Sequence, residues 1–212
     1  MTCGDSEVLH RLATGRRSIR RYKPTAVPDA TLDRILEAAR WAPSGHNRQP
    51  WRFAILTSFH LKDRLARAMG ERLRRDRLAD GDPIAAIDQD VTRSYARITG
   101  APVVIVVALD MSDMDRYPDD RQRAERTMAV QSTAMATQNL LLAAHAEGLG
   151  ACWLCAPLFC PDTVRDTLEL PEAWQPQGLV TLGLSLEPPK PKPRKLVSEI
   201  VIARPHPEMT GR

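Results

Sequence analysis

The feature that most constrains the fold is a continuous apolar run at 102–109, PVVIVVAL, in which most residues are β-branched. A strand that is apolar at every position must be covered on both faces, whereas a half-exposed strand alternates. The longest apolar run, 101–109, has nine residues. A membrane-spanning helix needs about 20. The sequence therefore predicts a central strand between helical layers and no crossing of a membrane.

Strands and helices alternate along the rest of the chain, which predicts an α/β or α+β sheet. Further strands are expected at 51–57, 151–155 and 178–186, and helices at 5–14, 29–41, 60–79, 83–98, 121–147 and from 161. The chain has 212 residues with no internal repeat and no dividing linker. It is predicted to form one domain, 1–212. The pattern does not give the order of the strands.

The longest predicted helix, 121–147, is rich in alanine and carries few charges after Arg126. If continuous, it is about 40 Å long. A helix that is apolar on all sides is typical of a central position. Near the C-terminus, the segment 188–193, PPKPKP, is expected to form a stiff, extended arm.

Lys and Arg number 30 against 26 for Asp and Glu, which gives a net charge of +4. A mild positive field suits an anionic partner such as a phosphorylated cofactor, a nucleotide or a nucleic acid, without choosing among them. The N-terminus lacks the apolar stretch of a signal peptide, so the protein is predicted to be cytoplasmic. The four cysteines are then expected to be thiols.

An arginine-rich segment, RRSIRRYKP at 16–24, follows the first predicted helix. Guanidinium groups bind phosphate through charge-assisted hydrogen bonds, and a serine hydroxyl adds a further donor. In an extended segment Arg16, Ser18 and Arg20 point to one side and Arg17 to the other. Considered alone, a solvated basic stretch is the more common interpretation of such a run.

A polar loop, APSGHNRQPW at 42–51, lies between a helix and a strand. The amides of Asn47 and Gln49 can pair with the edge of a heterocycle that both donates and accepts hydrogen bonds. An ordinary connection is the plainer interpretation, and a lone histidine such as His46 is more often a loop residue than a catalyst.

Cys152 and Cys155 form a C-x-x-C pattern, which can indicate a redox pair or half of a zinc site. Residues three apart in a strand face opposite sides, so the two sulfurs should diverge. No second pair of ligands accompanies them, even with Cys160 included. No metal site is predicted.

Several common signatures are absent from the sequence, including the P-loop, the G-x-G-x-x-G turn, the G-x-S-x-G elbow and H-E-x-x-H. Within the arginine-rich segment only Tyr22 is interleaved, and no nucleic-acid-binding module is recognisable. A basic nucleic-acid binder therefore remains a minor alternative, and no nucleic-acid partner is predicted.

Taken in order, these segments resemble the FMN-dependent nitroreductase family. The resemblance covers nearly the whole chain and rests on RRSIRRY at 16–22, WAPSGHNRQPW at 41–51, the long helix, GLGACW at 148–153 and a basic arm at 192–195. The second half, at 116–128, 138–153 and 158–178, is similar to the C-terminal reductase domain of the enzyme that makes the deazaflavin coenzyme of actinobacteria. That domain uses FMN to reduce a dehydro precursor. The APSGHN loop is more similar to general nitroreductases.

The resemblance implies an α+β fold with a mostly antiparallel or mixed central sheet flanked by helices. It also implies a homodimer with two FMN sites at the interface, NADH or NADPH as electron donor, and a small aromatic acceptor such as a nitroaromatic or a quinone, or an enone. No catalytic side chain is assigned, because the cofactor carries the redox chemistry.

The resemblance also assigns residues to the cofactor. Arg16, Arg17 and Ser18 would hold the FMN phosphate and ribityl chain, and Arg20 would lie near the pyrimidine edge. The phosphate would also meet a late basic residue, Arg194, or its neighbours Lys192 and Lys195. A second subunit would contribute Pro43, Ser44 and Asn47, and backbone groups at Ala156, Pro157 and Leu158 would approach the flavin.

Other interpretations remain open from the sequence. Within the family they are a dehydro-deazaflavin reductase, the oxygen-dependent flavin-fragmenting enzyme of cobalamin ligand synthesis, and dehalogenating or enone-reducing enzymes. Outside enzymes they are a non-catalytic flavin carrier and the nucleic-acid binder.

Overall fold

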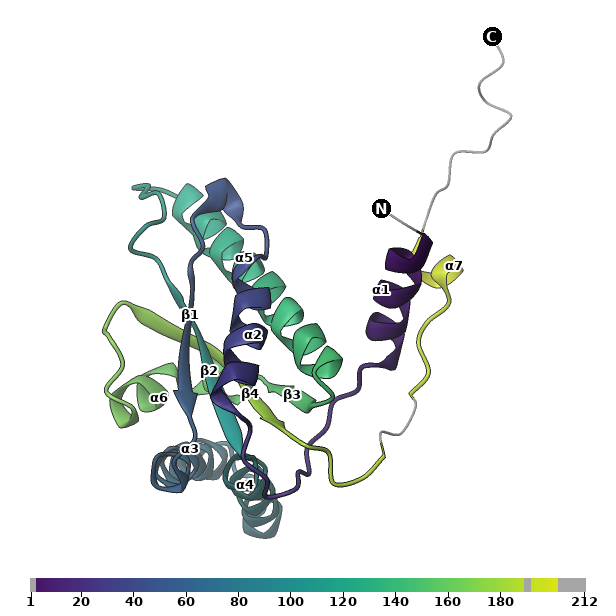
Figure 1. Cartoon of the computed structure of the whole chain (residues 1–212). Helices are drawn as coiled ribbons and strands as arrows, with labels where there is room; N and C mark the ends of the chain where they lie inside the picture. The colour runs from purple at the N-terminus through teal and green to yellow at the C-terminus, as the bar shows by residue number, and fades with distance from the viewer. Residues whose placement is uncertain (1–2, 189–191, 202–212) are drawn as a thin grey trace.

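The structure is a computed structural model in which residues 3–188 and 192–201 are described. Residues 189–191, which belong to the predicted proline-rich arm, lie outside the described part. The elements in chain order are α1 (Cys3–Gly15), α2 (Asp29–Arg40), η1 (Gly45–Asn47), β1 (Trp51–Leu56), α3 (Phe59–Ala79), α4 (Ile84–Thr99), β2 (Val103–Asp110), α5 (Arg121–Ala146), β3 (Gly150–Leu154), η2 (Ala156–Phe159), α6 (Pro161–Thr167), β4 (Trp174–Gly183) and α7 (Val197–Ile200) (Figure 1).

The four strands form one antiparallel sheet with the order β1-β2-β4-β3. The predicted α+β fold with an antiparallel central sheet flanked by helices is confirmed. β2 lies inside the sheet and every one of its residues is buried. β3 lies at an edge, so the outer side of this strand is available to other segments.

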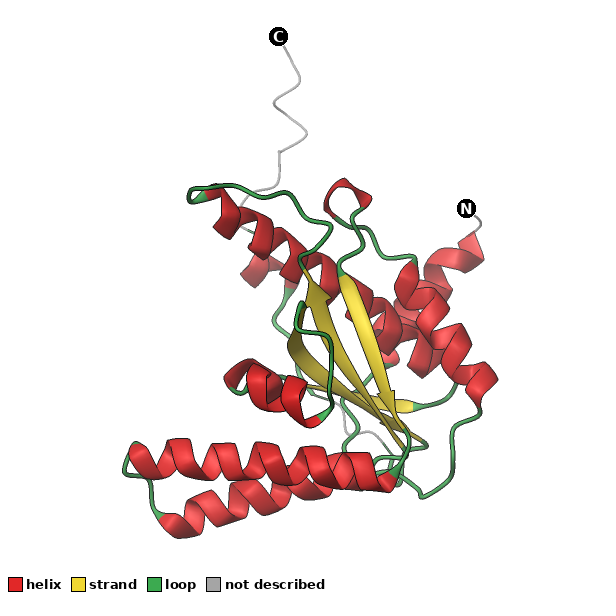
Figure 2. Cartoon of the chain, turned by 90° about the vertical axis from the view of Figure 1, so that its left-hand side faces the viewer, coloured by secondary structure: helices red, strands yellow, loops and turns green. Residues whose placement is uncertain are grey.

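Alternation along β2 divides the core into two layers. Val103, Ile105 and Val107 pack with α2 and α5 on one face of the sheet. Val104 and Val106 pack with α3, α4 and α6 on the other. Figure 2 shows the sheet between these helical layers, with the α3–α4 hairpin running along one side. The apolar run is therefore covered on both faces, as its composition predicts.

The long helix α5 packs on the sheet and against α2, but on one side only. Ala136, Leu140 and Ala144 are fully buried, whereas Ala134 and Met135 are exposed. The prediction of a central helix is thus correct for the sheet-facing side. On the opposite side, which carries few charges after Arg126, Ala134 and Met135 are exposed in the part of the chain that the structure describes.

The predicted strand 178–186 was wrong at both ends, because β4 spans Trp174–Gly183. A bulge between Val107 and Ala108 leaves Gln177 without a partner in β2, so that Pro176, which has no N–H to donate, lies opposite Ala108 at the bulge. After Gly183 the chain leaves the sheet and pairs with the arginine-rich segment instead. There the Lys23 N–H donates to the Leu184 carbonyl at 2.8 Å.

Tyr22 anchors the arginine-rich segment in the core. Its side chain is 8% exposed, and its hydroxyl hydrogen-bonds to Thr181 Oγ1 at 2.8 Å and donates to the carbonyl of Ile19. Burial raises the pKa of Tyr22 well above its usual value of 10.0. The hydroxyl therefore stabilises the fold in its protonated form.

We expect Tyr22→Phe to lower the free energy of unfolding by about 1–2 kcal/mol at neutral pH, because buried hydrogen bonds to Thr181 and Ile19 are lost. Folding raises this pKa, so the contribution is complete below pH ~10 and disappears as pH rises through the folded-state pKa. Urea unfolding of both proteins at neutral pH and above pH ~10 measures this. A pH dependence that is the same with and without the hydroxyl would contradict the assignment.

Among the helices of the described part, none is both long and apolar enough to span a bilayer.

Candidate functional site

The arginine-rich segment is held in an extended conformation along the edge of the sheet. Ser18 forms a parallel bridge with Ala151 of β3, and the Ile19 N–H donates to the Ala151 carbonyl at 3.0 Å. Tyr22 forms an antiparallel bridge with Ser185 beyond β4. Backbone pairing at both ends fixes where the cationic side chains lie.

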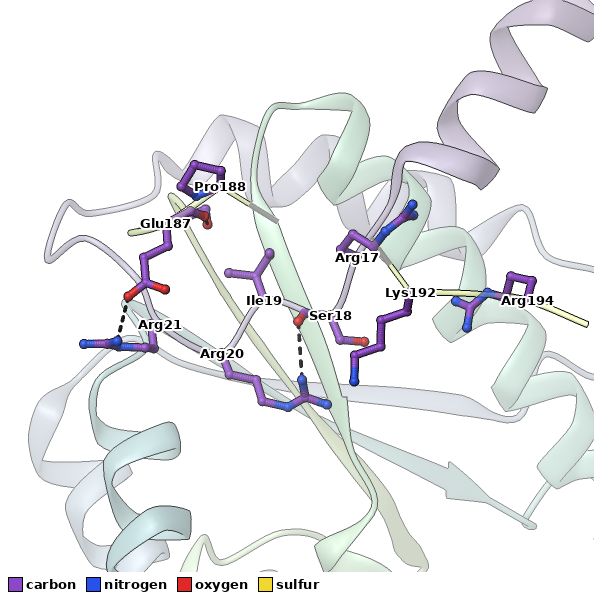
Figure 3. Close-up of a pocket in the computed structure, with 10 residues that line it drawn as sticks. Arg17, Ser18, Ile19, Arg20, Arg21, Glu187, Pro188, Lys192 and Arg194 are labelled. Atoms are coloured by element: carbon purple, nitrogen blue, oxygen red, sulfur yellow. Dashed lines mark hydrogen bonds and ion pairs between the residues drawn. The ribbon is translucent and has the colours of Figure 1, made fainter. Parts of the chain in front are cut away.

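A pocket of about 400 Å³ lies beside this segment (Figure 3). Arg17, Ser18, Arg20, Arg21, Glu187, Lys192 and Arg194 are among the residues that line it. Glu187 is the acidic residue of this lining, and it pairs with Arg21 at 2.6 Å. Within the described part of the chain, the other lining cations have no carboxylate partner at ion-pair distance. The pocket therefore combines uncompensated positive charge with a serine hydroxyl, which suits an anion.

The individual cations play different roles around Ser18. Arg17 donates to the carbonyls of Thr14 at 2.5 Å and Arg16 at 2.7 Å, so it closes the end of α1 and points away from Ser18, as Figure 3 shows. Arg20 instead reaches the Ser18 carbonyl at 3.4 Å. Arg16 lines an adjoining pocket of about 200 Å³ that also includes Arg17. Arg17 thus points away from Ser18, but Arg16, which was expected on the side of Ser18 and Arg20, lines only the adjoining pocket.

Arg97 of α4 is a site residue that the sequence did not indicate. It lines a second cleft together with Arg20. Burial lowers the pKa of Arg97, and the nearby charges of Arg20 and Arg93 lower it further. Nothing in the charged pattern of 84–99 separates Arg97 from its neighbours. Only the contact of α4 with the arginine-rich segment reveals it.

β3 connects the cationic region to η2. Cys152, in the middle of β3, is fully buried, and this burial raises the pKa of its thiol. The positive charges of Arg20 and Arg97 act on this pKa in the opposite direction. β3 then ends at Leu154, and η2 follows with Pro157 buried and Leu158 exposed. The segment 156–158 thus lies at the end of the same strand whose start meets Ser18. β3 therefore connects the cationic end of the site, beside Ser18, to the less polar end at 156–158.

The sulfurs of Cys152 and Cys155 diverge, as the strand geometry predicts. Cys152 is buried, whereas Cys155 is exposed and accepts a hydrogen bond from Trp153 Nε1 at 2.9 Å. In residues 3–188 and 192–201, no three His, Cys, Asp or Glu side chains are grouped in a way that could hold a metal ion.

The polar loop after α2 lies away from the basic pocket within one chain. Its residues Pro43, Ser44 and Asn47 do not line that pocket. The loop rests on α5 instead, with the Gly45 N–H donating to Ser132 Oγ at 3.2 Å. His46, at φ 50°, is one of three non-glycine residues of this loop in the left-handed region, with Asn47 and Gln49. Such strain is common at functional sites.

Gly150 allows the close approach of the arginine-rich segment to β3. A Cβ at this position would lie 2.7 Å from Ile19 Cβ. We expect Gly150→Ala to displace Ile19, to destabilise the fold by about 1–3 kcal/mol and to weaken binding of pyrophosphate, as measured by urea unfolding and calorimetry. The added variant Ile19→Gly, which removes the Cβ that the new methyl would meet, should recover part of both losses. No recovery in the double variant would show that the contact does not position the cations.

Comparison with known proteins identifies clear relatives. The model of the nitroreductase family matches residues 13–184. A Thermus thermophilus protein named NADH dehydrogenase is 31% identical over an alignment 217 residues long, gaps included. This match covers 91% of this chain and 94% of the relative. A protein of Methanothermobacter thermautotrophicus, provisionally named NADH dehydrogenase/NAD(P)H nitroreductase, is 31% identical over 185 residues, 86% of this chain and 80% of the relative. A solved structure from Desulfovibrio desulfuricans, provisionally described as a nitroreductase and in complex with FMN, is 30% identical with a TM-score of 0.71, and the match covers 94% of this chain and 98% of that one.

Proposed function

The chain belongs to the nitroreductase family, and from this premise we propose that it is an FMN-dependent oxidoreductase that passes a hydride from NADH or NADPH to an organic acceptor in a ping-pong cycle. The acceptor would be a nitroaromatic, a quinone or an enone. Similarity to relatives named for NADH and NAD(P)H chemistry supports a nicotinamide donor, and similarity to a protein in complex with FMN supports the cofactor.

The observation that carries this proposal is the uncompensated charge around Ser18. A phosphate monoester has a charge of about −1.5 to −2 at pH 7. Lys192 and Arg194 line the pocket with Arg17 and Ser18, and no described carboxylate pairs with these cations. The residues present therefore fit the phosphate of FMN, with Arg16 in the adjoining pocket close enough to contribute.

The rest of the site also fits a bound flavin. FMN supplies the two-electron chemistry, accepting a hydride from the donor and passing it on. The flavin gains negative charge when it is reduced. Arg20 and Arg97 would place positive charge beside it, and this attraction is strongest where water is partly excluded. Backbone groups at Ala156, Pro157 and Leu158 would meet the flavin at the end of β3. The chain itself then needs no side-chain acid or base.

We further propose that the protein is a single domain that assembles as a homodimer. The loop residues Pro43, Ser44 and Asn47 would complete the partner's site, since they lie away from the basic pocket of their own chain. The exposed side of α5 would form the contact. Leu9 in α1 and Ile200 in α7 are also exposed apolar residues in the part of the chain that the structure describes.

A finer alternative is the reduction of a dehydro-deazaflavin precursor, for which the anionic substrate would match the surplus positive charge. A non-catalytic flavin carrier is the alternative outside enzymes. An anaerobic titration separates these, because the absorbance of bound flavin near 450 nm should be bleached by NADH or NADPH only in an active reductase. A panel of acceptors that includes a dehydro-deazaflavin then identifies the substrate.

Arg16→Ala should weaken FMN binding by about 1.5–3 kcal/mol, because a charge-assisted hydrogen bond is lost. The dissociation constant from fluorescence titration of the apoprotein measures the loss. Arg75→Ala, which removes an exposed arginine of α3, is the matched control and should bind FMN as the wild type does. Equal affinity in the Arg16 variant and the wild type would reject this assignment.

Ala134→Glu places a charge in the exposed side of α5 and should dissociate the proposed dimer. Light scattering after size-exclusion chromatography should then show a monomer that retains less FMN, because each site would lose the partner's loop. Ala79→Glu, at the far end of α3, is the control. A dimer of unchanged stability would place the interface elsewhere.

A further inference from the structure

A second cleft, of about 470 Å³, separates α4 from residues 20–22 of the arginine-rich segment. Four arginines line it, namely Arg20, Arg21, Arg93 and Arg97, and the lining contains no acidic residue. Such a concentration of one charge in a cleft is costly without a counter-ion, because guanidinium groups at close range repel one another.

Nearby carboxylates neutralise this charge only in part. Arg21 pairs with Glu187. Arg93 pairs with Asp90, which also pairs with Arg77, and Arg77 pairs in turn with Asp82, so these two guanidinium groups are matched by two carboxylates. Arg20 and Arg97 have no ion pair within the described residues. The net charge of the cleft therefore remains positive.

The position of the cleft separates it from the phosphate pocket. Arg20 and Arg21 line both hollows, whereas Lys192 and Arg194 belong to the phosphate pocket alone and Arg93 and Arg97 to the cleft alone. Arg93 lies one helical turn before Arg97 on the same side of α4. Its side chain is 53% exposed. The row of cations thus continues from the proposed flavin site outward to solvent.

We propose that this cleft is a second anion subsite that binds a phosphate group of the molecule exchanging electrons with the flavin. The inference rests on the proposed function and adds to it the chemical class of the reaction partner. Arg93 binds the phosphate, while Arg20 and Arg97 remain with the flavin. The phosphate belongs either to the donor, as the 2′-phosphate of NADPH, or to a phosphorylated acceptor.

The two sources can be separated by measuring the half-reactions of the FMN-loaded protein. For the donor, the rates of anaerobic flavin bleaching by NADPH and by NADH are compared. For the acceptor, reoxidation of the reduced protein by 4-nitrophenyl phosphate is compared with reoxidation by 4-nitrobenzyl alcohol. The preference is the ratio of the rate with the phosphate-bearing partner to the rate with the other partner. In Arg93→Gln this ratio should fall about fivefold in one of the two comparisons, which is the loss expected when a half-exposed charge pair is removed.

Arg75→Gln is the matched control, since it removes an arginine from the same helical hairpin outside the cleft, and its preferences should equal those of the wild type. Calorimetry with inorganic pyrophosphate provides a reading that does not depend on turnover. It should show about fivefold weaker binding to the FMN-loaded Arg93→Gln protein.

Three outcomes would overturn this inference. If Arg93→Gln changed neither preference nor pyrophosphate affinity, the cleft would not be a phosphate subsite, and the proposed function would stand. If Arg93→Gln lost FMN while Arg75→Gln retained it, the cleft would be part of the flavin site itself. If neither nicotinamide bleached the wild-type flavin, the proposed function would fail and the inference with it.

Discussion

The site depends on the attachment of the arginine-rich segment to the sheet. Backbone bonds to β3 and to the chain beyond β4 fix its two ends, and the buried hydroxyl of Tyr22 also ties the second end to Thr181. A flexible chain would spread these cations apart, because like charges repel. Backbone pairing holds them together against this repulsion, so the folded state presents a concentrated positive charge beside Ser18.

The two helical layers determine which other residues reach this segment. α4 packs on the face of the sheet that carries Val104 and Val106, and this position brings Arg97 to Arg20. α5 packs on the opposite face and supports the strained loop through Ser132. The two predicted halves of the cofactor site thus lie far from each other in one chain. A second copy, as proposed, would be needed to bring them together.

Local sequence was a reliable guide where one physical requirement dominates. The uniform apolar character of 102–109 can be accommodated only between two layers. The prediction of β4 failed because a proline and a bulge reset its register, which depends on the partner strand. The exposed side of α5 was missed because composition does not say which side of an apolar helix is covered.

The sequence by itself determined the kinds of element, the buried central strand and the arginines and serine proposed to bind an anion, since these follow from periodicity and from the chemistry of single side chains. Tertiary structure alone decided the strand order, the assignment of Arg93 and Arg97 to a cleft with Arg20, and the distance of the polar loop from the basic pocket. The physical reason is that such contacts join segments distant in the chain, and their free energy depends on how whole layers pack.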